Sequence, residues 1–154
     1  MNRHVDVVPQ VGDIKTFELG PYTHKQIKEY CRREGDTNPF HIDPDSAARM
    51  CARLRPVSPG GVVVPGMLII NGFPKVIIGW LGLGATFSGI RRLSLHTPAF
   101  SGERIGVRLV VERRVQAHDG AFYECNALAK LDELGKTVLT SKFRMFVPTP
   151  GTVV

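Results

Sequence analysis

A long apolar segment in the middle of the chain, residues 62–83, is the feature that most constrains the fold. A transmembrane helix needs about 20 predominantly apolar residues with few interruptions. This segment is interrupted by two prolines, an asparagine, a lysine and several glycines. We therefore expect no membrane insertion. We predict instead a helix that begins at Pro65–Gly66, is buried on nearly every side and is kinked at Pro74.

The sequence beyond residue 84 changes to the alternating pattern of half-buried strands. Four strand-like stretches follow one another, at residues 87–95, 105–111, 122–131 and 137–147, and a weaker one precedes the helix at residues 14–19. Asp119–Gly120 is a two-residue hairpin signal. An antiparallel sheet with one apolar face would cover the single helix, which predicts an α+β fold. We expect one domain over residues 1–154, with residues 1–12 and 148–154 irregular.

Two short helices are predicted ahead of the apolar segment. Thr23–Gln26 is a capping box that starts the first helix, and Gly35 is placed to end it. Asp43–Pro44 is an N-cap signal for a second helix, which continues to residue 54. Between them, Pro39 keeps Asn38 out of the helical region. Residues 36–42 are therefore expected to form a short irregular loop.

The side chains of that loop can carry chemistry. Asp36 and His41 are five residues apart, and a carboxylate and an imidazole that reach one water molecule can perform general acid–base catalysis on it. The simpler interpretation of Asp43 is a helix cap. His41–Ile42–Asp43 could also suggest metal ligation, but no second cluster completes a metal site, so no metal is expected.

Taken together, residues 35–44 read Gly-Asp-Thr-Asn-Pro-Phe-His-Ile-Asp-Pro, and Ala47 and Ala48 follow. This segment strongly resembles the signature of the MaoC-like (R)-specific enoyl-CoA hydratases and 3-hydroxyacyl-thioester dehydratases, a hotdog-fold family. Gly66-Met67-Leu68 and the turn at residues 98–103 resemble further family segments. The resemblance covers roughly residues 11 to 147.

The resemblance implies a long helix wrapped by a curved antiparallel sheet, with two such units paired as a homodimer. It implies that Asp36 and His41 hold a catalytic water and that the backbone N–H of Gly66 binds the thioester carbonyl, beside Asn38 and Met67. A helix N-terminus is suited to stabilising an enolate oxygen. The implied reaction is reversible hydration of trans-2-enoyl thioesters to (R)-3-hydroxyacyl thioesters. No cofactor is needed beyond the coenzyme A or acyl carrier protein that bears the substrate.

Three features depart from the family pattern. The family usually has histidine where this chain has Pro65, and certain hydratases have serine where counting from Gly66 reaches Pro74. Residues 45–64 are also longer than is common. The first two departures leave Asp36 and His41 untouched, so catalysis is still expected, and they bear on the range of acyl groups. The longer segment could reshape the acyl pocket or act as a lid.

Charge and cysteine content indicate which partners and which cellular compartment to expect. The net charge is +6, which suits anionic carriers. The basic residues occur as separated pairs without interleaved aromatics, so no nucleic acid is expected. Three widely spaced cysteines without a CxxC pair, and no signal peptide, indicate a reducing cytoplasmic location. The candidate phosphate contacts are Arg32, Arg33, Arg53, Arg55, Arg91 and Arg92.

Two other functions fit the same fold. A hotdog thioesterase would hydrolyse an acyl thioester, although the intact Asp36 and His41 pair favours hydration. A non-catalytic partner subunit of a heterodimeric dehydratase would be expected to lose one of these two residues, and both are present.

Overall fold

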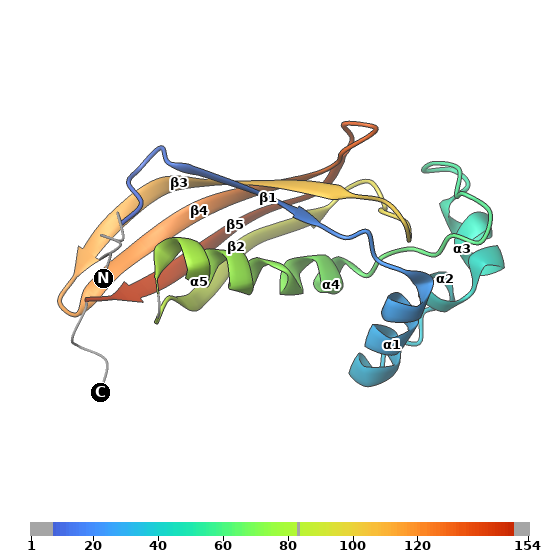
Figure 1. Ribbon diagram of the computed structural model, residues 1–154, viewed down its shortest axis with the longest axis horizontal. Helices are drawn as coiled ribbons and strands as arrows, with labels where there is room; N and C mark the ends of the chain where they lie inside the picture. The colour runs from blue at the N-terminus through green and yellow to red at the C-terminus, as the bar shows by residue number, and fades with distance from the viewer. Residues whose placement is uncertain (1–7, 83, 150–154) are drawn as a thin grey trace, which may run out of the picture.

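The computed structural model describes residues 8–82 and 84–149. One antiparallel sheet has the strand order β1-β3-β4-β5-β2. Its strands are β1 (Ile14–Leu19), β2 (Thr86–Leu95), β3 (Ile105–Ala117), β4 (Gly120–Leu131) and β5 (Thr137–Pro148). The sheet arches over helices α4 (Gly66–Asn71) and α5 (Phe73–Leu81), as Figure 1 shows. The predicted α+β hotdog arrangement is confirmed, and all five predicted strands are present.

The central helix is interrupted at Gly72, two residues before the predicted kink at Pro74. The N–H of Gly72 still reaches the carbonyls of Ile69 and Ile70. Pro74 is the second residue of α5, where its missing N–H costs no intrahelical hydrogen bond. A Cβ atom on Gly72 would lie 2.5 Å from Cδ2 of Leu19. Glycine at this position therefore lets β1 pack closely against the break. No helix in the described part of the chain is long and apolar enough to cross a membrane.

The prediction that the helix is buried on nearly every side is wrong for the single chain. One face packs on the sheet, and its buried side chains are Ile69, Ile70, Phe73, Ile77 and Leu81. The opposite face is exposed at Met67, Asn71, Lys75 and Ile78. The physical reason is that the sheet covers only one side of the helix (Figure 1). The apolar residues on the other side are available to a second layer.

The core lies between the central helix and the inner face of the sheet. Alternate residues of β3 are fully buried, as their spacing predicted: Ile105, Val107, Leu109 and Val111. The helix places Phe73 against Phe17 of β1 and Phe143 of β5, with ring centroids 5.7 and 6.5 Å apart. This packing fixes the helix relative to both halves of the sheet.

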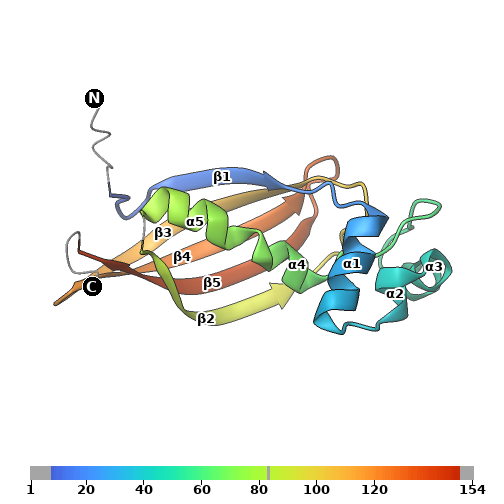
Figure 2. The ribbon, with the colours of Figure 1, turned by 60° about the horizontal axis from the view of Figure 1, so that its bottom comes forward.

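Three short helices stand at the end of the sheet where α4 begins (Figure 2). They are α1 (His24–Glu34), α2 (Pro39–Ile42) and α3 (Pro44–Cys51). Thr23 caps α1 through the predicted capping box, and Gly35 ends it in the left-handed conformation with φ of 72°. Asp43 caps α3 by accepting from the N–H groups of Asp45 and Ser46.

Two local predictions need correction. Residues 36–42 are not irregular throughout, because Pro39–Ile42 forms one helical turn with Pro39 in its first turn. A proline is compatible with that position because its fixed φ suits the helix and its missing N–H costs no hydrogen bond there. Asn38 itself is extended, as predicted before a proline. The helix that begins after Asp43 ends at Cys51, three residues earlier than predicted.

Candidate active site

Asp36 is held in a tight turn directly after α1. Its backbone N–H donates to the carbonyl of Cys31 at 2.9 Å. One carboxylate oxygen, Oδ1, accepts from both the backbone N–H of Asn38 at 3.1 Å and the Asn38 side-chain amide at 2.8 Å. These bonds fix the carboxylate plane and leave the other oxygen, Oδ2, pointing toward His41.

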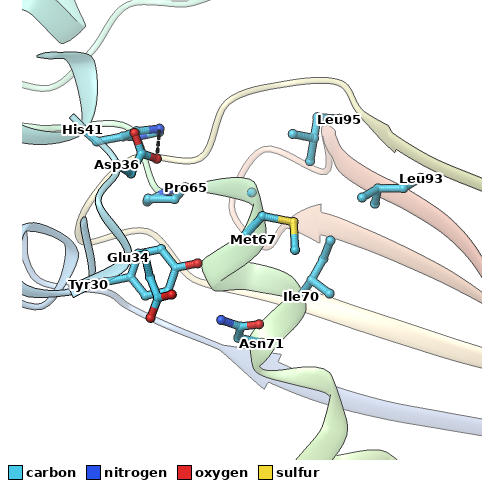
Figure 3. Close-up of a pocket in the computed structure, with 11 residues that line it drawn as sticks. Tyr30, Glu34, Asp36, His41, Pro65, Met67, Ile70, Asn71, Leu93 and Leu95 are labelled. Atoms are coloured by element: carbon cyan, nitrogen blue, oxygen red, sulfur yellow. Dashed lines mark ion pairs between the residues drawn. The ribbon is translucent and has the colours of Figure 1, made fainter. Parts of the chain in front are cut away.

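His41 lies on α2 and is almost completely buried. Its Nδ1 atom is 2.7 Å from the carbonyl oxygen of Val63. A carbonyl only accepts, so this assigns the proton to Nδ1, and Nε2 of the neutral ring carries a lone pair. Nε2 is 3.6 Å from Oδ2 of Asp36 (Figure 3). That separation is too long for a strong direct hydrogen bond and suits a bridging water.

A cavity of about 490 Å³ opens in front of this pair. Asp36 and His41 lie at one end, and Met67 of α4 lies along a side wall (Figure 3). Gly66, the first residue of α4, also lines the cavity. Leu93 and Leu95 of β2 line the apolar side of the cavity. The structure therefore brings together four of the five predicted site residues. The fifth, Asn38, does not line the cavity and acts on it through Asp36.

Sequence reasoning missed three polar residues of the same cavity: Tyr30, Glu34 and Asn71. Tyr30 also belongs to the buried face of α1, with Ile27 and Cys31. The sequence did contain a signal for them. Tyr30 and Glu34 are four residues apart and so share one face of the helix that ends just before Asp36. Burial raises the pKa of the Tyr30 hydroxyl, which therefore stays protonated at neutral pH and can donate a hydrogen bond.

A second, more apolar cavity of about 270 Å³ lies beside the first. The two share His41, Gly66 and Leu95. Phe40 and Val63 are among the apolar side chains that line the second cavity. His41 thus lies where two cavities of different polarity meet.

The predicted phosphate contacts are only partly available. Arg55 is buried and paired with Glu103, so its assignment as a phosphate contact is wrong. Arg91 pairs with Glu124 at 3.1 Å, and Arg33 pairs with Glu34 at 2.8 Å. The remaining three candidates are exposed: Arg32, Arg53 and Arg92.

The cysteines do not contribute a nucleophile to the site. All three are free and buried. Burial raises the pKa of Cys31 and Cys51, and it raises the pKa of Cys125 to about 12. A protonated, inaccessible thiol is a poor nucleophile. Within residues 8–82 and 84–149, no group of three or more His, Cys, Asp or Glu side chains could hold a metal ion.

Comparison with known proteins gives one curated relative. The chain is 30% identical over 96 residues to the mitochondrial 3-hydroxyacyl-[acyl-carrier-protein] dehydratase of Arabidopsis thaliana. The matched region is 62% of this chain and 52% of the relative, so the chain spans about half the length of the relative that it matches. No protein-family model matches the sequence.

Solved structures match over nearly the whole chain. The (R)-hydratase from A. caviae involved in PHA biosynthesis has a TM-score of 0.73 and 23% identity, over 91% of this chain and 98% of that one. The MaoC-like dehydratase from Rhodospirillum rubrum gives 0.70 and 21%, over 92% and 95%. The HadBC (3R-hydroxyacyl-ACP dehydratase) complex from Mycobacterium tuberculosis gives 0.67 and 15%, over 89% and 96%.

At these identities the structural matches establish the hotdog fold. The sequence match adds a likeness to a curated dehydratase over 62% of the chain. The chain is therefore similar in fold to an (R)-hydratase and a MaoC-like dehydratase, and similar over part of its sequence to a 3-hydroxyacyl-[acyl-carrier-protein] dehydratase. The names of these proteins include both hydratases and dehydratases.

Proposed function

We propose that this protein is a hydro-lyase that adds water reversibly to trans-2-enoyl thioesters and forms (R)-3-hydroxyacyl thioesters. The observation that carries the proposal is the arrangement of Asp36 and His41. Each presents one acceptor atom, Oδ2 and Nε2, and these lie 3.6 Å apart at the end of the cavity. A water molecule that donates to both acceptors keeps a lone pair of its oxygen free for attack.

The proposed reaction balances without a cofactor. The water oxygen forms a bond to C3 of the enoyl group while one of its protons passes to the Asp36 and His41 pair. The electrons of the C2–C3 double bond move toward the thioester carbonyl, and the pair returns a proton to C2. The reverse sequence dehydrates the hydroxyacyl thioester.

Gly66 is proposed to stabilise the charge that develops on the thioester oxygen. It is the first residue of α4 and lines the cavity beside His41. The N–H groups of a first helical turn have no intrahelical acceptor and can donate to an oxyanion. Met67, the next residue, is proposed to contact the substrate from the same wall.

A homodimer through β2 is proposed as the working form. β2 is an edge strand of the sheet. It exposes Ile90, Leu93 and Leu95 by 47%, 37% and 60%, and Met67 on α4 is 53% exposed. A long apolar edge is a template for pairing with another strand. A second copy would cover this edge and close the open side of the cavity.

The carrier and the compartment stay predictions. Coenzyme A and an acyl carrier protein both fit the net charge of +6. The curated relative is an acyl-carrier-protein dehydratase of mitochondria, so the expected cytoplasmic location needs its own measurement.

The test is turnover of a short trans-2-enoyl-CoA, followed by loss of the enoyl-thioester absorbance. We expect rapid loss with the wild type and with Glu133→Ala, which removes an exposed carboxylate far from the site in sequence. Asp36→Ala and His41→Ala should be nearly silent while remaining folded. Unchanged activity in both variants would refute the proposed site.

Release of free thiol from an acyl-CoA would instead support a thioesterase. A wild type that is silent with acyl-CoA and carrier-protein substrates alike would support a partner subunit.

A further inference from the structure

The carbonyl that orients His41 belongs to a segment held in place by another part of the chain. Val63 donates its N–H to the Phe40 carbonyl at 2.9 Å and accepts from Nδ1 of His41. On its other side, Val63 forms a β-bridge with Phe100, and the N–H of Val64 donates to the Ala99 carbonyl at 2.8 Å. The direction of the Val63 carbonyl therefore depends on the turn at residues 98–103.

Arg55 fixes that turn from within the protein. Its guanidinium lies over the Phe100 ring at 4.2 Å from the centroid. Its Nε donates to the Pro98 carbonyl at 3.1 Å, and its Nη2 forms an ion pair with Oε1 of Glu103. The other oxygen of Glu103 accepts from the backbone N–H of Phe100 at 2.7 Å. The side chains of Arg55 and Glu103 thus contact both ends of the turn at residues 98–103 and its middle residue, Phe100.

The location of this ion pair argues for a role in geometry. Arg55 is 8% exposed and its partner Glu103 is half-buried, and the guanidinium lies beside a small apolar cluster that contains Val63 and Phe100. Burying an ion pair costs desolvation free energy, and apolar residues of similar volume would often stabilise such a cluster as well or better. An ion pair with directional hydrogen bonds does what apolar packing cannot, because it sets the position of specific backbone atoms.

We propose that Arg55 and Glu103 are positioning residues for His41. Through Phe100 and Val63 they hold the carbonyl that keeps the proton on Nδ1, and they thereby keep the Nε2 lone pair directed at Asp36 and the cavity. The catalytic consequence rests on the proposed hydratase function, whereas the effect on the His41 tautomer does not.

The experiment compares variants that cut the ion pair with variants that preserve part of it. Arg55→Met removes the charge and its hydrogen bonds while keeping much of the apolar volume, and Glu103→Ala removes the acceptor. Arg55→Lys keeps a charge but cannot reproduce the forked contacts, and Glu103→Gln keeps an acceptor for the Phe100 N–H. Val57→Ala is the matched control, because Val57 packs against the same cluster without contributing to the ion pair.

The first measurement is the NMR spectrum of the His41 ring nitrogens, which needs no substrate. We expect the wild type and Val57→Ala to show a proton on Nδ1 only, and Arg55→Met and Glu103→Ala to show a mixture of tautomers. A pure Nδ1–H tautomer in both of these variants would overturn the proposal. This result stands whether or not the protein hydrates enoyl thioesters.

The second measurement is kcat and KM in the variants that remain folded. A displacement of about 1 Å in a catalytic group can cost roughly 100-fold in rate. We expect Arg55→Met to lower kcat by about 10- to 100-fold with little change in KM, and Arg55→Lys and Glu103→Gln to lie between it and the wild type. If Val57→Ala lowers kcat as much at an equal loss of thermal stability, the ion pair is merely structural and the proposal fails.

Discussion

Oδ2 of Asp36 lies 3.6 Å from Nε2 of His41, while the other polar atom of each group is already engaged. Asn38 occupies Oδ1 of Asp36, and the Val63 carbonyl occupies Nδ1 of His41. Each catalytic candidate thus uses one atom for its own orientation and presents the other to the cavity. Because each side chain depends on a neighbouring group for its orientation, we expect substitutions of residues that do not contact a substrate to lower activity.

Asn38→Ala should reduce turnover without unfolding the protein. The variant keeps the backbone N–H that donates to Oδ1 of Asp36 and loses the amide that donates at 2.8 Å. A hydrogen bond to a charged group contributes about 1.5–3 kcal/mol, and 1.4 kcal/mol corresponds to a tenfold change in rate. We expect kcat to fall about tenfold, with a thermal midpoint lowered by a few degrees in a protein that remains folded. Wild-type kcat in this variant would show that the amide does not orient Asp36.

Gly66→Ala should narrow the cavity at the head of the central helix. A Cβ atom at this position would lie 2.6 Å from Cδ1 of Leu95, so the exposed Leu95 side chain would have to move. We expect a folded protein with reduced kcat/KM. Gly79→Ala is the control, because no atom lies within 4 Å of its Cβ position. It should leave activity unchanged and raise stability by about 0.5–1 kcal/mol. Equal activity of the two variants would show that the cavity tolerates a methyl group at Gly66; the backbone N–H proposed to bind the oxyanion is retained in both.

Local signals explain why much of the fold could be predicted from the sequence. The capping box at Thr23, the left-handed glycine at Gly35 and the Asp43 cap each satisfy backbone groups within a few residues. The alternation of buried residues along β3 is equally local, and the structure confirms these features. The predicted hairpin is present, but its turn residues are His118 and Asp119, and Gly120 already pairs with Ala117 as the first residue of β4.

The features that the sequence did not predict depend on contacts across the fold. The break at Gly72 is coupled to the approach of Leu19, more than fifty positions earlier in the chain. The burial of Arg55 depends on Glu103, which no local pattern links to it. The exposed side of the central helix depends on how much of the helix the sheet covers. In each case the partner is distant in sequence, and one chain read along its length does not reveal it.

The candidate site shows the same contrast. Asp36 and His41 could be predicted because both lie in one short motif, whereas the orienting carbonyl belongs to Val63, 22 residues after His41. A backbone carbonyl has no residue-type signature. The role of Val63 could therefore be found only from the structure.

Ile90→Asp should disrupt the proposed dimer. Ile90 is 47% exposed on the edge strand β2, and a carboxylate there opposes strand pairing between two copies. Ile14→Asp is a matched control, because Ile14 is 49% exposed on the other edge strand, β1. Sedimentation analysis should show a dimer for the wild type and for Ile14→Asp, and a monomer for Ile90→Asp. A dimer in all three proteins would place the interface elsewhere.

Cys125→Ala should flatten the loss of stability at alkaline pH. Burial raises the pKa of the Cys125 thiol from 9.0 to about 12 in the folded protein. Between these values the unfolded chain has lost this proton and the folded chain has kept it, so stability must fall as pH rises. One group contributes a slope of about 1.4 kcal/mol per pH unit in this window. Urea unfolding of both proteins from pH 8.5 to 10.5 should show that the free energy of unfolding falls less steeply with pH in the variant. The variant starts from a lower stability because it has lost side-chain packing, so the slopes are compared and not the absolute values. Parallel declines would mean that the Cys125 thiol titrates alike in both states.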